Sequence, residues 1–166
     1  MNPEQEEKLY KQFSDLFRER KLPLASSNMP LGIQFEDGWY DLIFELCKNI
    51  QNIVKENNLL EVSFHEVSKS EDGALKIGIR NSTSLIDSYI ASAIEGSRYS
   101  CEICSYSPSF QRKTKSSGKN QQQMLCGQCF RRSRGPKAPK HKKGPQQPSR
   151  RSEPTIVQYP SKRKGK

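Results

Sequence analysis

Histidine is scarce in this chain of 166 residues, which contains only His65 and His141. Without histidines beside its cysteines, the chain lacks the general base and the additional metal ligands that a metal-dependent nuclease needs. No nucleophile elbow is present, and no βαβ pattern surrounds the cysteines as it would in a thioredoxin-like redox protein. We therefore predict that the protein is not an enzyme, has no catalytic residues and takes no small-molecule substrate.

Long apolar runs are also lacking, because no stretch approaches the run of about 20 apolar residues that a transmembrane helix needs. The first residues are acidic, which is unlike a signal peptide. Hydrophobic residues make up 33% of the chain, enough for one small domain beside a segment that does not fold. We expect a protein of the cytoplasm, or of the nucleus if the host has one, without a membrane partner.

Acidic residues are almost missing from the C-terminal part. Residues 101–166 contain 17 Lys/Arg and 2 Asp/Glu, a net charge of +15, whereas residues 1–100 contain 11 and 16, a net charge of −5. A segment this basic that lacks an amphipathic apolar face indicates a polyanionic partner, and nucleic acid fits better than a membrane surface. The predicted partner is therefore nucleic acid, either DNA or RNA.

Two Cys-x2-Cys pairs are the strongest motif in the sequence. Cys101 and Cys104 form the first pair and Cys126 and Cys129 the second, with 21 residues between the pairs. Two such pairs supply the four thiolates of a tetrahedral zinc site, which is structural because protein ligands fill every position. Reduced structural thiols or two disulfides are the alternatives. We predict one structural Zn2+, with Gly127 in a positive-φ conformation that turns backbone amides toward a thiolate.

The first hundred residues show the periodicity of helices with one buried face. An amphipathic helix is predicted over residues 3–20, and its apolar stripe would pack on the domain, on a second copy or on a partner. After a loop over residues 22–38, apolar residues at steps of three and four predict a helix over residues 39–57. Trp39 and Cys47 fall on its apolar face, so we expect both side chains in the core.

Further along, the apolar period changes to two, which predicts an antiparallel hairpin. The residues assigned to the core face of its first strand are Leu60, Val62 and Phe64. The second strand, residues 75–79, follows the turn signal Asp72-Gly73. A helix capped by Ser82 or Ser84 then ends near Gly96 and leads directly into the first cysteine pair.

The predicted fold class is α+β. An N-terminal helix (residues 1–21) precedes a small helix–β-hairpin–helix domain (residues 37–98). Residues 99–134 would form a four-cysteine zinc module, a zinc ribbon or treble-clef-like knuckle pair, with a polar loop over residues 105–125 between the cysteine pairs. Residues 135–166, rich in Pro, Lys, Arg, Gln, Ser and Gly, would be a disordered basic tail.

Aromatic and basic side chains are interleaved between the cysteine pairs, and basic residues continue beyond the second pair. Cations contact phosphates, and exposed rings stack on unpaired bases. A solvated loop whose rings pack against the metal site is the alternative. The candidate nucleic-acid-binding residues are Tyr106, Phe110, Arg112, Lys113, Lys115, Lys119, Arg131, Arg132, Arg134, Lys140, Lys142 and Lys143.

Two glycine motifs accompany the cysteines: Gly38-Trp39 at the start of the long helix and Gly73-Ala-Leu75 in the second strand. Together with Glu95-Gly-Ser97 and the two cysteine pairs, these motifs resemble a family of small phage and prophage proteins of unassigned function. The resemblance covers about residues 37–130 and implies a C-terminal zinc site without implying an activity. Ser105 stands where that family usually has a knuckle glycine.

These observations predict a non-enzymatic, zinc-stabilised nucleic-acid-binding protein that contacts mainly phosphates, with weak sequence specificity. One alternative is a phage- or mobile-element-type interaction factor, which would bind a host or structural protein through its acidic domain or N-terminal helix. Another is a component of an RNA-rich assembly.

Overall fold

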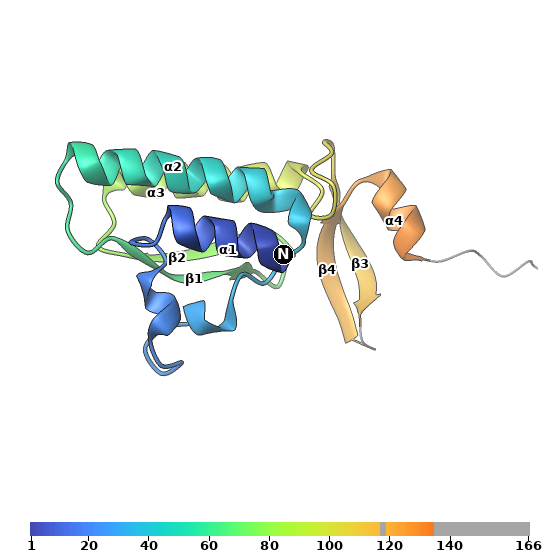
Figure 1. The fold of residues 1–166 in the computed structure, drawn as a ribbon. Coiled ribbons are helices and arrows are strands. Elements are labelled where there is room, and N and C mark those ends of the chain that lie inside the picture. The colour runs from blue at the N-terminus through green and yellow to red at the C-terminus, as the bar shows by residue number, and fades with distance from the viewer. Residues whose placement is uncertain (117–118, 135–166) are drawn as a thin grey trace, which may run out of the picture. The chain divides into compact units, whose positions relative to one another are not determined.

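Two long helices, α2 (Tyr40–Glu56) and α3 (Ser84–Tyr99), pack together over a two-stranded sheet (Figure 1). The sheet is an antiparallel hairpin of β1 (Ser63–Lys69) and β2 (Leu75–Arg80). This arrangement, in a computed structural model that describes residues 1–116 and 119–134, confirms the predicted α+β class. Only the backbone is described for residues 115, 116, 119 and 120. No described helix combines the length and apolar composition that crossing a membrane requires.

The buried face of α2 agrees with the apolar periodicity of the sequence. Trp39, directly before α2, and Cys47, within it, are both 0% exposed, which confirms their predicted places in the core. Burial raises the pKa of the Cys47 thiol, so this cysteine stays protonated and unreactive.

The N-terminal helix α1 (Pro3–Gln12) is shorter than predicted and does not reach Arg20. The chain turns at Phe13, and the Leu16 carbonyl then accepts a backbone hydrogen bond from Phe64 of β1 at 2.8 Å. A continuous helix would have used this carbonyl internally. The apolar stripe packs in the core of the domain rather than remaining open for a partner. Its buried members are Leu9, Phe13, Leu16 and Phe17.

The loop after α1 contains three short 3-10 helices and covers the free edge of β1. They are η1 (Arg18–Lys21), η2 (Met29–Leu31) and η3 (Asp37–Trp39). The amides of Asn28 and Gln34 donate to the carbonyls of His65 and Val67, at 2.8 and 3.5 Å. The outer edge of β1 is thereby protected from pairing with another chain.

A bulge in β1 overturns part of the predicted strand phase. The register shifts between Phe64 and Glu66, so one extra residue separates Phe64 from the next core position. Val67 therefore joins Phe64 on the buried side, although strict alternation placed it on the other face. Leu60, assigned to the core face, lies before the strand and is 82% exposed.

The start and end of α3 also differ from the prediction. Thr83, rather than Ser82 or Ser84, is the N-cap, and its side chain accepts a backbone hydrogen bond from the first turn. The helix continues past the predicted end near Gly96, so that Ser100 alone separates it from the first cysteine pair.

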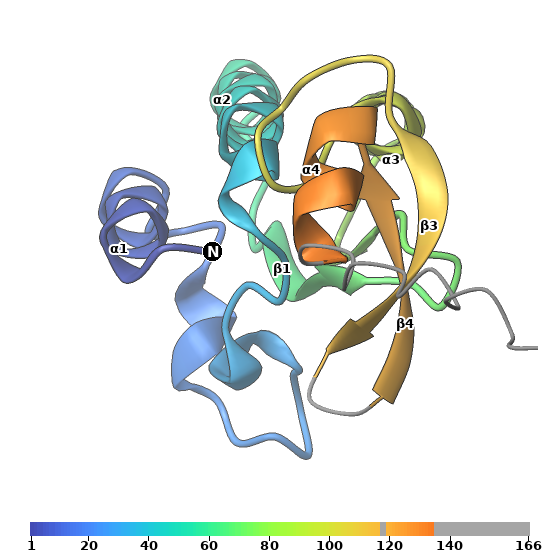
Figure 2. The ribbon, with the colours of Figure 1, turned by 90° about the vertical axis from the view of Figure 1, so that its right-hand side faces the viewer.

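The segment between the cysteine pairs is a hairpin, and the prediction of a loop is wrong. β3 (Phe110–Ser116) and β4 (Lys119–Leu125) pair antiparallel in unbroken register. A short helix, α4 (Gly127–Ser133), follows at once and packs against both strands (Figure 2). The predicted tail over residues 135–166 lies outside the described residues.

Candidate metal centre and its surroundings

The four cysteines of the two pairs converge where β4 meets α4. Their Sγ atoms all lie within 4.8 Å of one another; Cys104 is 3.5 Å from Cys129 and 3.8 Å from Cys126. Tetrahedral Zn–S bonds of about 2.3 Å place sulfur atoms about 3.8 Å apart. All five cysteines of the chain are free thiols. The cluster therefore has the ligand set and spacing that fit one zinc ion.

Backbone hydrogen bonds bring the two pairs together. The amide of Glu102, within the first pair, donates to the Met124 carbonyl on β4 at 2.9 Å. The amide of Cys101 donates to the Tyr106 carbonyl at 3.0 Å and closes the turn around the first pair. Ser105 makes this turn with a left-handed φ of 61°, a conformation that favours glycine.

The second pair lies at the start of α4, with Cys126 as its N-cap and Cys129 in its first turn. Gly127 has helical rather than positive φ, so its predicted role is wrong. The amide of Cys129 donates to Cys126 Sγ at 3.4 Å, and this hydrogen bond, together with those from the Cys104 and Cys129 thiols, lowers the pKa of Cys126 to about 7. Burial and the neighbouring thiols raise the pKa of Cys129. Four thiolates this close together need a cation to ionise together, and a bound Zn2+ would supply that charge.

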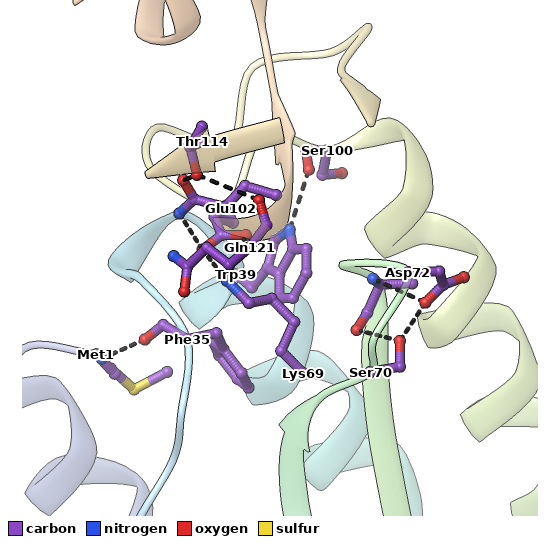
Figure 3. Close-up of polar contacts among 12 residues, drawn as sticks. Met1, Phe35, Trp39, Lys69, Ser70, Asp72, Ser100, Glu102, Thr114 and Gln121 are labelled. Carbon is purple, nitrogen blue, oxygen red and sulfur yellow. Dashed lines mark hydrogen bonds and ion pairs between the residues drawn. The ribbon is translucent and has the colours of Figure 1, made fainter. Parts of the chain in front are cut away.

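The first cysteine pair rests on the start of α2. The amide of Gly38 donates to the Glu102 carbonyl at 2.8 Å. The Trp39 indole donates to the Ser100 carbonyl at 3.0 Å (Figure 3). A Cβ atom at Gly38 would lie 2.3 Å from the Cys101 carbonyl oxygen. The Gly-Trp motif of the sequence is thus a contact surface for the cysteine turn.

The second glycine motif makes the corresponding contact with β4. Gly73 has a φ of 84°, and a Cβ atom there would lie 2.8 Å from the Gln122 carbonyl carbon. The neighbouring Asp72 accepts hydrogen bonds from the Ser70 hydroxyl and from Arg98, which lower its pKa from 3.8 to about 2. Residues 101–134, which we call the cysteine module, therefore belong to the same compact unit as the preceding body (residues 1–100).

A buried polar network that the sequence analysis missed joins the module to the body. Glu102 is 0% exposed and accepts hydrogen bonds from Lys69 Nζ of β1 and Gln123 Nε2 of β4, both at 2.9 Å (Figure 3). Thr114 donates to Gln123 Oε1 at 2.6 Å. Glu102 is the only acidic residue of the module, and this is the one feature of the sequence that could have indicated a buried ion pair.

The predicted nucleic-acid-binding residues whose side chains are described lie on more than one face of the module. Arg112 on β3 lies between two rings, with its guanidinium carbon 5.4 Å from the centre of Phe110 and 4.8 Å from that of Phe130. The guanidinium carbon of Arg134 also lies near Phe130, at 5.5 Å from the centre of its ring. These cation–π contacts hold both guanidinium groups along the β3–α4 face.

Lys113 lies on the opposite face of the hairpin from Arg112, because side chains alternate along a strand. There it lines a pocket of about 480 Å³ with Lys69 and Gln121. The remaining lysines have no described side chains: Lys115 and Lys119 lie on β3 and β4, and Lys140, Lys142 and Lys143 fall outside the described residues.

Tyr106 and Arg131 come together beside the start of α4. Both line a hollow of about 370 Å³ beside Cys126, and Tyr106 is 64% exposed. Gln128, which no sequence pattern singled out, lines the same hollow. Arg132 follows on the exposed surface of α4.

Comparison with known proteins gives no relative: no family model, curated protein or solved structure matches the chain.

Proposed function

We propose that the cysteine module is a treble-clef-like zinc module that binds nucleic acid, mainly through phosphates, without catalysing a reaction. A cysteine turn, a β-hairpin and a helix carrying the second cysteine pair follow one another in the treble-clef order. One structural Zn2+ would occupy the four thiolates and hold these elements together.

The distribution of charge supports the proposal. The only carboxylate of the module, Glu102, is buried against Lys69, so every charged side chain on the module surface is cationic. Those arginines and lysines of the module whose side chains are described take part in no ion pair. Unpaired, exposed cations on a fixed scaffold are what phosphate neutralisation requires.

The charge of the body determines from which side nucleic acid would approach the protein. It carries a net charge of −5 and would repel a polyanion, so nucleic acid would approach from the module side. The contacts at Gly38 and Gly73 hold the module against the body. The basic residues 135–166 would add phosphate contacts of their own.

The proposal is tested by the salt dependence of binding. Zinc-loaded protein is titrated into a labelled oligonucleotide at salt concentrations from about 50 to 200 mM, and anisotropy gives the dissociation constant. A triple variant with Arg131→Gln, Arg132→Gln and Arg134→Gln removes three cations of the module. It should reduce the slope of log affinity against log salt by about 2 to 3, because each lost phosphate contact releases one fewer counterion.

A matched control changes the same number of charges on the body. Lys11, Lys48 and Lys55 are exposed on α1 and α2, and their replacement by glutamine should leave the slope unchanged. Equal effects of the two triple variants would show that net charge, not the module, drives binding. No binding of DNA or RNA at the lowest salt would overturn the proposal.

A second candidate function is protein binding by the loop after α1. Three leucines are exposed on this segment: Leu22, Leu24 and Leu31. Single exposed leucines are common on protein surfaces, whereas several on one segment indicate a site for a partner. A protein partner that stays bound in about 0.5 M salt, where ionic attraction is screened, would favour this function. The variant Leu24→Ser should then lose that partner without changing affinity for nucleic acid.

A further inference from the structure

The hollow beside the cysteine cluster combines three kinds of side chain that recognise a nucleotide. Tyr106 contributes an exposed ring from the turn after the first cysteine pair. Gln128 and Arg131 contribute an amide and a guanidinium group from α4. A ring stacks on any base, an amide hydrogen-bonds to a base edge, and a guanidinium group binds phosphate.

Hydrogen bonds of the cysteine turn and of α4 hold the backbone around the hollow. The carbonyl of Tyr106 accepts the 3.0 Å hydrogen bond from Cys101, which anchors the residue to the metal cluster. Gly127 leaves the floor open, since an added Cβ atom would meet only Arg131 Nη1, at 3.8 Å. A volume of about 370 Å³ is at the small end of ligand pockets, which suits one base better than a duplex.

Charge decides which part of a nucleotide fits the hollow. Cys126 forms part of its lining, and four thiolates around one Zn2+ carry a formal charge of about −2. A phosphate group would be repelled at this position, whereas a neutral base would not. Arg131 at the side of the hollow and the exposed Arg132 next to it are free to take the adjoining phosphates.

We infer that this hollow holds one unpaired base, stacked on Tyr106 with its edge at Gln128, and that the protein binds single-stranded nucleic acid in preference to duplex. The inference rests on the proposed function and adds a substrate class to it. A base within a duplex cannot enter, because its faces are stacked and its edge is paired.

The test compares Tyr106→Ala and Tyr106→Phe in the full-length, zinc-loaded chain. The probes are labelled single-stranded DNA, the same sequence as RNA, and the DNA duplex. Tyr106→Ala should weaken single-strand binding about tenfold, within the range measured for loss of one stacked base, and Tyr106→Phe should change it less than about twofold. Duplex binding and the salt slope should stay unchanged in both, because no cation is removed.

Tyr99, the last residue of α3, provides the matched control, because its ring is also exposed (57%) but does not line the hollow. Tyr99→Ala should bind single strands like the unmodified protein. One zinc per chain in every variant would show that the cluster is intact.

Two failures are distinguishable. If single strands and duplex bind alike, or if Tyr99→Ala and Tyr106→Ala lose affinity equally, the base-binding hollow is wrong while phosphate binding stands. If no nucleic acid binds at low salt, the proposed function fails, and the hollow loses its ligand with it.

Discussion

Substituting Gly38 by alanine tests whether the cysteine module is held in place by the start of α2. The added Cβ atom would lie 2.3 Å from the Cys101 carbonyl oxygen and 2.7 Å from the Cys104 amide nitrogen. Both are backbone atoms of the cysteine turn, which cannot rotate away as a flexible side chain would. Because Gly38 does not have a left-handed φ, the substitution tests this contact without adding backbone strain.

The expected cost follows from two effects. Non-bonded heavy atoms normally stay about 3.5 Å or more apart, so the turn must move by about 1 Å, and overpacking of this kind costs about 1–3 kcal/mol. The same movement breaks the 2.8 Å hydrogen bond from Gly38 to Glu102. Its loss adds about 1 kcal/mol. The free energy of unfolding should therefore fall by about 2–4 kcal/mol.

Urea unfolding of the zinc-loaded protein, followed by tryptophan fluorescence, measures this change. Trp39 is the only tryptophan, and its indole contacts the cysteine turn, so the probe sits at the contact under test. Gly127→Ala is the matched control: its Cβ atom, at the start of a helix, would make only an ordinary van der Waals contact with Arg131 Nη1 at 3.8 Å, and it should be neutral or slightly stabilising. A Gly38→Ala protein within about 0.5 kcal/mol of the unmodified chain would refute the contact as a source of stability.

Three further outcomes are expected. Cys126→Ser should lose stoichiometric zinc in metal analysis by mass spectrometry, whereas Cys47→Ala should keep one zinc per chain, because Cys47 lies in the core away from the cluster. Glu102→Gln should lower the free energy of unfolding by about 2–4 kcal/mol, because it leaves Lys69 unpaired. Adding Lys69→Met should restore most of the lost stability. A double variant that is no more stable than Glu102→Gln alone would contradict this role of the ion pair. Gly73→Asn tolerates the left-handed φ but keeps the clash with β4, so it should still lose about 1–3 kcal/mol in urea unfolding.

The body of the protein was largely predictable because its apolar residues follow a regular period. The helix over residues 39–57 and the Asp72-Gly73 hairpin agree with α2 and the β1–β2 turn to within a few residues. Local pattern failed where a tertiary contact decided the backbone. The hydrogen bond from Phe64 to Leu16 ends the helical course of the N-terminal segment, and the bulge after Phe64 changes which later residues face the core.

The cysteine cluster was predictable from spacing alone, but the hairpin between the pairs was not. Its central cross-strand pairs join polar residues, such as Arg112 with Gln123 and Lys113 with Gln122, so no apolar alternation marks the strands. What stabilises the hairpin is contact with the body and with Glu102, and neither appears as a period in the sequence.

The glycine motifs of the body contact the backbone of the cysteine module. Gly38 lies against the first cysteine pair and Gly73 against the strand that leads into the second, and at both positions a side chain would collide with module backbone. A module that only needed tethering to the body would not require close backbone contact at two separate points. Two such contacts, together with the buried ion pair of Glu102 and Lys69, fix the orientation of the basic surface relative to the acidic body. Loosening either contact should therefore reduce affinity for nucleic acid even in a variant that retains its zinc and all its cations.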